Sequence, residues 1–533
     1  MTPSRIARIL SPRPPSFVSI TVADLLREAA SEQPDRCALV FWEGGPRVRW
    51  SYRDLLEKSE AVARRLAASF VPGERLAVWA YNCAEWLPLQ YGAAMAGLTL
   101  VAVSPASTAR ELSYILSQSQ SSGLVYGIWT KTGDRAAMAQ AARQDIASLQ
   151  HVFALETLVE EVAGESSSAA LPAVDPASIA MIQYTSGTTG MPKGAMLTHA
   201  GLTNTTRASE AALALEPGSV RLNGVPMYNT AGSVLCSMNT LWNRGTHVML
   251  RQFDATQVLD AIEAEKVNWV PLVPTMAIAV MDHPRCASAD LASLEIVQTG
   301  GAPIAPELVA RIEADLAADC VVVFGMTETS SVLCMTDRHD TLEHRTQTIG
   351  YPLAGIEVEI RNVATGETAS IGEIGEIMMR GHSVTPGYFN MPEATAKAID
   401  RDGWLHSGDL GLIREDGYLE IRGRLKEMII KGGSNIYPRE IEDALAEHPG
   451  IELTAVFGLP DAKYGEIVAA AVIARPDAAP TLQEFRAFLD ERLSSFKIPS
   501  AFYRVDEMPM SPMGKIQKHV LVEMASSGSL SPW

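Results

Sequence analysis

The stretch Tyr184-Thr-Ser-Gly-Thr-Thr-Gly-Met-Pro-Lys-Gly194 constrains the fold and the function more tightly than any other part of this sequence. It contains four Ser/Thr hydroxyls, three glycines and the single lysine Lys193. Glycines let backbone N–H groups approach phosphate oxygens, hydroxyls donate further hydrogen bonds, and a lysine supplies a mobile positive charge. The composition of this stretch therefore predicts a loop that holds a triphosphate.

The flanking residues distinguish this loop from other phosphate-binding loops. The apolar run 179–182 predicts a buried strand, and 195–198 predicts a second strand that turns into a helix near His199. A Walker loop opens directly into a helix after its lysine, whereas a glycine and a strand follow Lys193. The alternative interpretation, a surface turn rich in glycine and threonine, is disfavoured by the density of the run.

Length, charge and cysteine usage narrow the class of protein. A chain of 533 residues that is 47% hydrophobic suggests roughly three to four domain-sized units of ordinary soluble composition. Its formal charge of −18 argues against binding to nucleic acid or to an anionic membrane surface. The six cysteines are scattered without a close pair, which predicts free thiols rather than a zinc site or disulfides.

No stretch of the sequence is typical of a membrane segment or of a secretory signal. The N-terminus runs into Pro12, Pro14 and Pro15 without an apolar core, and the apolar stretch 267–281 is interrupted by two further prolines. We therefore expect a cytoplasmic protein without integral membrane association.

The rhythm of the sequence predicts the fold class. Amphipathic helical segments alternate with short apolar runs over 21–104 and again over about 245–325, which is typical of parallel α/β layers. Between 350 and 424 the pattern changes to short β segments separated by glycine turns. We predict an α/β protein: a large N-terminal domain of two α/β lobes plus a small β-barrel-like subdomain, followed by a small mobile α+β C-terminal domain. The predicted boundaries are about 20–180 and 181–348 for the lobes, about 349–424 for the β subdomain, and 427–533 for the C-terminal domain.

Two further motifs follow apolar strands, at the strand ends where open α/β sheets bind ligands. They are Gly300-Gly-Ala-Pro303 and Phe324-Gly-Met-Thr-Glu328. Phe324 offers a flat face for a purine, and Glu328 offers a hard oxygen ligand for Mg²⁺ beside phosphates. Taken alone, each motif could equally be a routine turn after a strand.

The remaining motifs lie in the last quarter of the chain. Asp409 can accept hydrogen bonds from two ribose hydroxyls, and Arg424 can brace the same sugar or a phosphate. In isolation, a turn-capping aspartate and an exposed surface arginine would be the preferred interpretations. Two lysines beside glycines complete the set, Lys431 in Lys-Gly-Gly-Ser-Asn and Lys515 in Pro-Met-Gly-Lys-Ile.

In combination and in this order, these motifs resemble those of the ANL superfamily of adenylate-forming enzymes, over nearly the whole chain. The resemblance implies a reaction in two steps. A carboxylate first attacks the α-phosphorus of ATP and releases pyrophosphate, and a thiol then attacks the acyl-adenylate and releases AMP. It also implies an N-terminal adenylate-forming domain over 1–424, a hinge at 425–426 with Lys426 as its pivot, and a C-terminal lid domain that rotates between the steps.

The resemblance implies a role for individual residues. Lys515 would bridge the acid carboxylate and the α-phosphate, and Lys193 and Glu328 would complete the catalytic set, with Glu328 also holding Mg²⁺. The Lys431-Gly432-Gly433 loop would line a tunnel for the pantetheine arm of coenzyme A. The implied ATP and AMP site comprises Thr185, Ser186, Gly187, Thr188, Thr189, Lys193, Gly301, Ala302, Pro303, Phe324, Gly325, Met326, Thr327, Asp409 and Arg424.

The segment Pro226-Met-Tyr-Asn-Thr-Ala-Gly232 bears on the acid. Relatives that activate amino acids usually have an aspartate here for the α-ammonium group, and this segment has no carboxylate. An acid without an α-amino group is therefore favoured, and mostly small or neutral pocket walls suit an apolar or aryl acid. The candidate walls are Tyr228, Asn229, Gly301, Gly325, Ser330 and Val332.

Asn229 is a departure from the family pattern, because histidine usually follows the aromatic residue here. Asparagine cannot ionise and offers only amide hydrogen bonds. The substitution therefore leaves open a ligase specialised for thiolation that adenylates weakly. Independently of Asn229, two further alternatives to an AMP-forming acid:CoA ligase stay open, a stand-alone enzyme that loads a carrier-protein pantetheine and a non-catalytic nucleotide-binding relative. A homodimer is also left open.

Overall fold

The computed structural model describes residues 6–131, 134–161, 170–185, 191–301, 304, 306–432, 434–475, 480–510 and 516–533. The chain divides into two compact units. The large unit comprises Ile9–Val358 and Met379–Leu405, and the small unit comprises Met1–Arg8, Glu359–Met378 and His406–Trp533. Each unit is described separately below.

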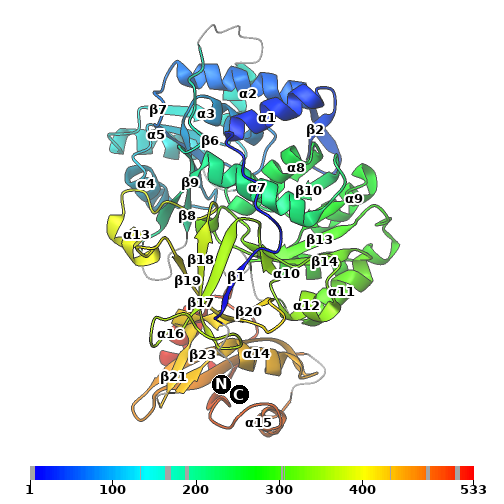
Figure 1. The fold of residues 1–533 in the computed structure, drawn as a ribbon, viewed down its shortest axis with the longest axis vertical. Coiled ribbons are helices and arrows are strands. Elements are labelled where there is room, and N and C mark those ends of the chain that lie inside the picture. The colour runs from blue at the N-terminus through cyan, green and yellow to red at the C-terminus, as the bar shows by residue number, and fades with distance from the viewer. Residues whose placement is uncertain are drawn as a thin grey trace. The chain divides into compact units, whose positions relative to one another are not determined.

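The first sheet of the large unit carries the arms of the phosphate loop. Its strand order is β7–β6–β4–β5–β8–β9 (Figure 1), parallel from β7 to β8, with β9 antiparallel to β8. The apolar runs of β4 and β5 are almost fully buried, as their composition predicts, whereas β7 is half-buried. The strands are β4 (Arg75–Trp79), β5 (Thr99–Val103), β6 (Gly123–Tyr126), β7 (His151–Ala154), β8 (Ile179–Thr185) and β9 (Lys193–Thr198). The accompanying helices are α2 (Tyr52–Ala67), α3 (Trp86–Met95), α4 (Ala109–Gln118), α5 (Arg135–Asp145) and α6 (Leu155–Glu161).

The second sheet of the large unit has the order β16–β15–β14–β13–β12–β10–β11–β2–β3. Its middle strands are parallel, and β2 and β3 from the beginning of the chain form one edge. Its strands are β2 (Cys37–Trp42), β3 (Pro46–Ser51), β10 (Val220–Asn223), β11 (Thr246–Leu250), β12 (Trp269–Pro271), β13 (Ile296–Gly300), β14 (Asp319–Phe324), β15 (Cys334–Met335) and β16 (Tyr351–Pro352). Its helices are α1 (Val22–Glu32), α7 (His199–Leu213), the π-helix η1 (Ala231–Cys236), α8 (Ser237–Trp242), α9 (Ala255–Glu265), α10 (Pro274–Met281), α11 (Pro306–Leu316) and α12 (Leu342–Gln347).

Short turns and a further helix complete these two layers. They are η2 (Cys286–Ser288), η3 (Thr327–Thr329) and α13 (Pro392–Ala398). Several helices begin where their sequence predicts, because a Ser or Thr side chain accepts a hydrogen bond from the first turn. Ser51 before α2 and Thr108 before α4 both form complete capping boxes.

A third sheet has the order β1–β17–β18–β19–β20, and the division between the units falls within its strands. It corresponds to the region of short β segments and glycine turns. Its strands are β1 (Arg8–Leu10), β17 (Ile356–Arg361), β18 (Gly375–Gly381), β19 (Leu405–Ile413) and β20 (Leu419–Arg424).

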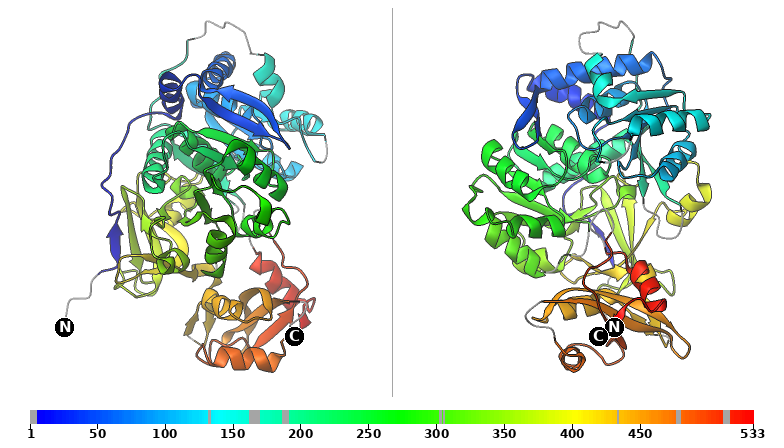
Figure 2. Two further views of the ribbon diagram at one scale, coloured as in Figure 1. Left: turned by 90° about the vertical axis from the view of Figure 1, so that its right-hand side faces the viewer. Right: turned by 180° about the vertical axis from the view of Figure 1, so that it is seen from behind.

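The C-terminal part of the small unit is an α+β structure built on the long β23–β24 hairpin, with α16 packed against β23 (Figure 2). Its sheet has the order β22–β21–β24–β25–β26, and β23 pairs with β24. The elements are η4 (Leu425–Glu427), β21 (Ile429–Lys431), β22 (Ser434–Ile436), α14 (Pro438–Ala446), β23 (Ile451–Asp461), β24 (Gly465–Ala474), α15 (Leu482–Asp490), β25 (Ala501–Arg504), α16 (Lys518–Ser526) and β26 (Ser531–Pro532). The predicted α/β fold class, with a large N-terminal part and a small C-terminal domain, is confirmed.

The state of the cysteines and the apolar character of the helices can also be compared with the sequence. All six cysteines are free thiols, and five of them are buried. Among the helices in the described ranges, none has the length and apolar character needed to cross a membrane.

Candidate active site

The predicted phosphate loop connects β8 and β9, which form an antiparallel pair. Thr185 lies opposite Lys193 and Tyr184 lies opposite Gly194, so the two arms meet in register. A side chain at Gly194 would bring its Cβ within 2.7 Å of Ile182 Cγ2, so only glycine fits between the strands here. Ser186, Gly187, Thr188 and Thr189, the predicted phosphate contacts at the tip, lie outside the described residues.

Glu328 lies in the turn that follows β14 and faces inward. Glu328 is 5% exposed, and its Oε1 accepts a hydrogen bond of 2.7 Å from the hydroxyl of Tyr388. The backbone makes this turn compact: Ser330 adopts a left-handed conformation, and a Cβ at Gly325 would lie 1.8 Å from the carbonyl oxygen of Ser331. The short polar turn Met326–Glu328 is thus held close to the end of β14.

Tyr388 was not among the predicted site residues, and it contacts two of them. Besides its bond to Glu328, its ring lies beneath the Lys193 ammonium, with Nζ 5.1 Å from the ring centroid. Burial, together with the nearby Glu328 carboxylate, raises the pKa of Tyr388 above its usual value, so the phenol is a proton donor at neutral pH. The only signal in the sequence is an aromatic residue after a Pro-Gly turn, and that is too common to identify a site.

The predicted purine-binding face is largely covered. Phe324 at the end of β14 is 9% exposed, so only a small part of its ring is accessible to a base. Gly300 is the last residue of β13, and Gly301, which follows it, has a φ of +76°, which glycine adopts without strain. Ala302 and Pro303 lie outside the described residues.

The acid segment leads directly into the π-helix η1. The carbonyl oxygen of Asn229 accepts bonds from the Ser233 N–H at 3.0 Å and the Ser233 hydroxyl at 2.9 Å. The same hydroxyl lies 3.4 Å from Nε2 of Gln183, which is on β8 two residues before Thr185. Gln90 on α3 donates to the Ser233 carbonyl oxygen at 3.0 Å. The acid segment is therefore fastened to the strand that carries the phosphate loop.

The other candidate walls of the acid pocket differ in exposure. Tyr228 and Asn229 are half-buried, whereas Ser330 and Val332 are buried. The Ser330 hydroxyl donates to the Ser383 carbonyl oxygen at 2.9 Å, which ties the Glu328 turn to the segment after β18. The segment Tyr228–Ala231 brings no carboxylate to this pocket.

In the small unit, Asp409 and Arg424 lie opposite each other on the antiparallel strands β19 and β20. Arg424 Nε and Asp409 Oδ1 are 3.1 Å apart, and the Asp409 side chain is 10% exposed against 45% for Arg424. A buried carboxylate paired with an accessible guanidinium suits recognition of a sugar and a phosphate. The sequence motifs that contain the two residues are fifteen positions apart and meet through this hairpin.

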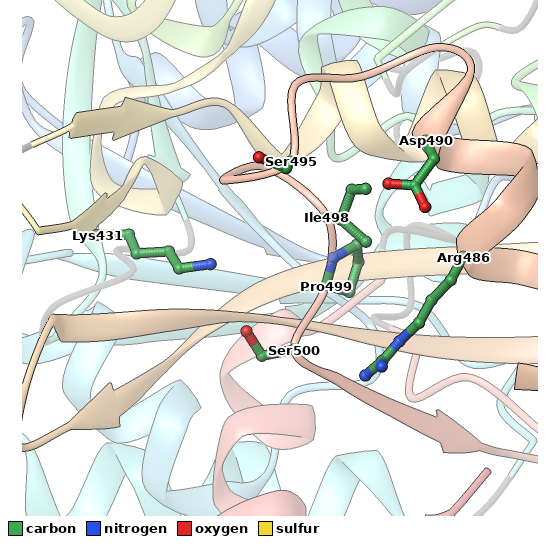
Figure 3. A pocket seen from close by; sticks show the side chains of 7 residues that line it. All are labelled: Lys431, Arg486, Asp490, Ser495, Ile498, Pro499 and Ser500. Atoms are coloured by element: carbon green, nitrogen blue, oxygen red, sulfur yellow. The ribbon is translucent and has the colours of Figure 1, made fainter. Parts of the chain in front are cut away.

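Lys431 lies at the edge of an open cavity of about 320 Å³ in the small unit (Figure 3). Its Nζ donates to the Phe496 carbonyl oxygen at 3.0 Å, and Gly432 has a φ of +59°. Gly433 lies outside the described residues. The cavity is lined by Lys431, Arg486, Asp490, Ser495, Ile498, Pro499 and Ser500.

The predicted pivot Lys426 lies in the short turn η4, and Lys515 lies outside the described residues. The chain on either side of 511–515 is anchored, because Met510 and Ile516 form an antiparallel bridge. Lys518 makes ion pairs of 3.0 Å with Glu427 and 2.8 Å with Glu442. Burial alone would lower the pKa of Lys518, but the two carboxylates outweigh it and raise that pKa above its usual value.

The Glu328 carboxylate is a suitable ligand for a magnesium ion. The described part of the chain contains no cluster of three or more metal-ligating side chains. One carboxylate oxygen of Glu328 accepts from Tyr388, which leaves the second oxygen to face a cation. Mg²⁺ typically takes one or two protein carboxylates together with substrate phosphates, so a single Glu is sufficient. The ion would neutralise charge on the phosphates of bound nucleotide.

Comparisons with known proteins agree with this geometry. Residues 26–389 match the model of the AMP-binding enzyme family, and residues 440–515 match the model of the AMP-binding enzyme C-terminal domain. A CoA ligase of Rhodococcus jostii, named for a bicyclic methyl-dioxo-octahydroindenyl propanoyl acid, is 33% identical over 94% of this chain and 98% of its own. The mitochondrial medium-chain acyl-CoA ligase ACSF2 of Mus musculus is 31% identical over 95% of this chain and 88% of its own.

A solved structure is similar over the same span. The crystal structure of ATP-bound MatB from Rhodopseudomonas palustris has a TM-score of 0.86 and 29% identity, and covers 95% of this chain and 99% of MatB. The chain belongs to the AMP-binding enzyme family, that is, to the ANL superfamily of adenylate-forming enzymes, and within it to the AMP-forming acyl-CoA synthetases. The predicted family and enzyme class are confirmed.

Proposed function

We propose that this enzyme activates a carboxylic acid without an α-amino group as its acyl-adenylate and transfers the acyl group to coenzyme A. The observation that carries the proposal is the Ser233 hydroxyl, which lies 3.4 Å from Gln183 and fastens the acid segment to the strand of the phosphate loop. This contact supports the proposal because it joins the candidate acid segment to the strand that leads into the phosphate loop, within the large unit. The acid segment offers no carboxylate to an ammonium group, which disfavours an amino acid.

In the first step an oxygen of the acid carboxylate attacks the α-phosphorus, and pyrophosphate leaves with the electron pair of the broken bond. Negative charge accumulates on the phosphoryl oxygens, so placed cations and donors dominate catalysis. Lys193 and the loop hydroxyls hold the β- and γ-phosphates, Glu328 holds Mg²⁺, and Lys515 bridges the acid and the α-phosphate. Asp409 and Arg424 bind the ribose side of the nucleotide.

In the second step the thiol of coenzyme A attacks the adenylate carbonyl, and AMP leaves. We propose that the C-terminal domain, residues 427–533, changes its orientation about Lys426 and brings the Lys431 loop to the acceptor. The cavity beside Lys431 also presents Arg486, and two cations at one cavity suit a phosphorylated ligand such as coenzyme A. We also propose a cytoplasmic location for the enzyme.

A pyrophosphate-release screen tests the proposal. Alkyl, aryl and polycyclic acids are each assayed with ATP and Mg²⁺, with and without coenzyme A or a holo-carrier protein. We expect release with at least one acid class lacking an α-amino group, and acyl-CoA formation with free coenzyme A. Transfer to the carrier alone would identify a carrier-loading enzyme, and failure to form AMP with any acid or supplied adenylate would identify a non-catalytic relative.

A substitution at Lys515 tests the two half-reactions separately. Lys515→Ala is expected to reduce pyrophosphate release by about two to three orders of magnitude, since one placed donor contributes on the order of 3 to 4 kcal/mol. Thiolysis of a supplied acyl-AMP is expected to continue at the wild-type rate. The role assigned to Lys515 would be wrong if both half-reactions kept equal rates.

Asn229 favours one competing function, a ligase specialised for thiolation. Its half-buried side chain offers an amide where relatives usually have an ionisable imidazole. We expect the wild type to release pyrophosphate readily, and Asn229→His to change mainly the preferred acid. A wild type that thiolyses supplied adenylates but releases pyrophosphate only after Asn229→His would support the competing function instead.

A further inference from the structure

The segment Thr385–Phe389 pairs with the outgoing arm of the phosphate loop. Phe389 N–H donates to the Gly194 carbonyl oxygen at 2.8 Å, and Met196 N–H donates to the Gly387 carbonyl oxygen at 3.0 Å. Ala195 and Tyr388 form an antiparallel bridge between them. The segment therefore extends the β8–β9 hairpin by one further extended stretch of chain.

The same segment is bonded to the Glu328 turn. Thr385 N–H donates to the Glu328 carbonyl oxygen at 2.7 Å, while the Thr385 hydroxyl donates to the Met196 carbonyl oxygen at 2.6 Å. The Tyr388 N–H is held by the Thr395 hydroxyl at 2.9 Å. Backbone and threonine bonds thus fasten the segment on both sides without any contribution from the phenol.

The phenol ring of Tyr388 makes two further contacts, which are separate from the backbone and threonine bonds that hold the segment. Its hydroxyl donates to Glu328 Oε1 at 2.7 Å, and its face lies 5.1 Å from Lys193 Nζ. A carboxylate with one oxygen occupied by a fixed donor cannot rotate freely, so the direction of its second oxygen is set. The ring face attracts the ammonium electrostatically and restricts a long flexible side chain.

We propose that Tyr388 is a positioning residue that holds the Glu328 carboxylate and the Lys193 ammonium in a fixed mutual arrangement for a metal-bound triphosphate. The proposal rests on the proposed function for the roles of Glu328 and Lys193. Its effect is confined to the adenylation step, because the triphosphate and its metal are present only there. Tyr388 itself transfers no proton and makes no bond to the substrate.

The test compares Tyr388→Phe with Tyr52→Phe, each of which removes one buried hydroxyl. Tyr52 is 1% exposed and donates to the Gly245 carbonyl oxygen at 2.7 Å, the same distance as the Tyr388 bond, and it lies outside the site. Mn²⁺ affinity is measured by electron paramagnetic resonance in the presence of a non-hydrolysable ATP analogue. We expect Tyr388→Phe to weaken Mn²⁺ binding about tenfold, since a hydrogen bond to a charged group is lost, and Tyr52→Phe to leave it unchanged.

A double-mutant cycle with Glu328→Gln shows whether the effect passes through the carboxylate. The change from Tyr388 to Phe is expected to have little effect on Mn²⁺ affinity once Glu328 is replaced. Thiolysis of a supplied acyl-AMP is expected to proceed equally in the wild type and in Tyr388→Phe. Tyr388→Leu additionally removes the ring face, and is expected to weaken binding of the metal-free nucleotide analogue more than Tyr388→Phe does.

Several outcomes would overturn the proposal. Equal Mn²⁺ affinity in the wild type and Tyr388→Phe would do so, as would additive effects of the Tyr388 and Glu328 changes. A loss of thiolysis equal to the loss of adenylation would indicate general structural damage. Failure of the wild type to release pyrophosphate with any acid would instead refute the proposed function, and the Mn²⁺ comparison would still decide the role of Tyr388.

Discussion

At the scale of single residues, two of the candidate carboxylates, one in each unit, contact a side chain from another element. Asp409 and Arg424 face each other across a hairpin, and Glu328 meets Tyr388 from a segment sixty positions later. In each pair the carboxylate is buried, and it contacts a side chain that donates to it. Such pairs keep a charged group oriented before any substrate arrives.

Asp409→Asn is expected to raise the KM for ATP about tenfold and to change kcat less. The amide keeps one acceptor oxygen but loses the negative charge that holds Arg424 and accepts two ribose hydroxyls. Steady-state pyrophosphate release at varied ATP measures the effect. Asp416→Asn is the matched control on the same hairpin, since Asp416 pairs with Arg414 at 3.4 Å and is exposed. Equal KM changes in the two variants would contradict the assignment.

The residues of the site were predictable to different degrees. Lys193 and Glu328 lie in motifs whose local composition suits phosphate or metal. Asp409 and Arg424 were nominated by the resemblance to a family, because each alone is more typical of a turn cap or a surface cation. Tyr388 lies in none of the motifs, and its contact with Glu328 is a hydrogen bond made across the fold. Contacts of this kind depend on tertiary packing, which periodicity and composition do not encode.

At the scale of elements, the π-helix Ala231–Cys236 begins within the candidate acid segment 226–232 and continues beyond it. A π-helical turn holds an extra residue and is frequent at functional sites. The turn is crowded at its start, because a Cβ at Gly232 would lie 2.3 Å from the Pro226 carbonyl oxygen. The path of the acid segment therefore depends on that glycine.

Gly232→Ala is expected to lower the free energy of unfolding by about 1–3 kcal/mol through overpacking and to raise the KM for the acid. Gly224→Ala is the matched control a few residues earlier, since the nearest atom to its Cβ would be Phe253 Cδ2 at 3.7 Å. Thermal melts and acid-dependent kinetics measure both effects. Unchanged behaviour of Gly232→Ala would show that the segment can move away.

The sequence predicts the helices and strands well, because apolar runs and capping boxes are local signals. It does not predict that Ala231–Cys236 is a π-helix, since six residues are too few to show a period in the apolar pattern. It also does not reveal that β2 pairs with β11, and β3 with β2, at one edge of the second sheet. Strand partners at such separations are chosen by tertiary packing.

At the scale of the whole molecule, buried histidines make stability depend on pH. Burial lowers the pKa of His199 to about 4 and that of His247 to about 3. Within the described residues, both ring nitrogens of His247 lack a hydrogen-bond partner. The folded protein keeps these imidazoles neutral at a pH where the unfolded chain, with a histidine pKa near 6.5, already binds protons.

Stability is therefore expected to be fully present above about pH 6.5 and to fall as the pH decreases toward the folded pKa values. At pH 5 the loss is about 2 kcal/mol for each such histidine, at 1.36 kcal/mol per pKa unit. His247→Phe should make the melting temperature less sensitive to pH between 7.5 and 5. His339→Asn, a change at an exposed histidine, serves as the control. Identical pH sensitivity of His247→Phe and the wild type would contradict the expectation.

The described residues near the end of the chain are joined to the rest of the C-terminal domain. Met510 and Ile516 form an antiparallel bridge with each other, and Lys518 is paired with both Glu427 and Glu442. If the C-terminal domain rotates between the two half-reactions, as proposed, these residues travel with it as part of one large body. Solvent viscosity, which slows the diffusion of large bodies, should then slow turnover.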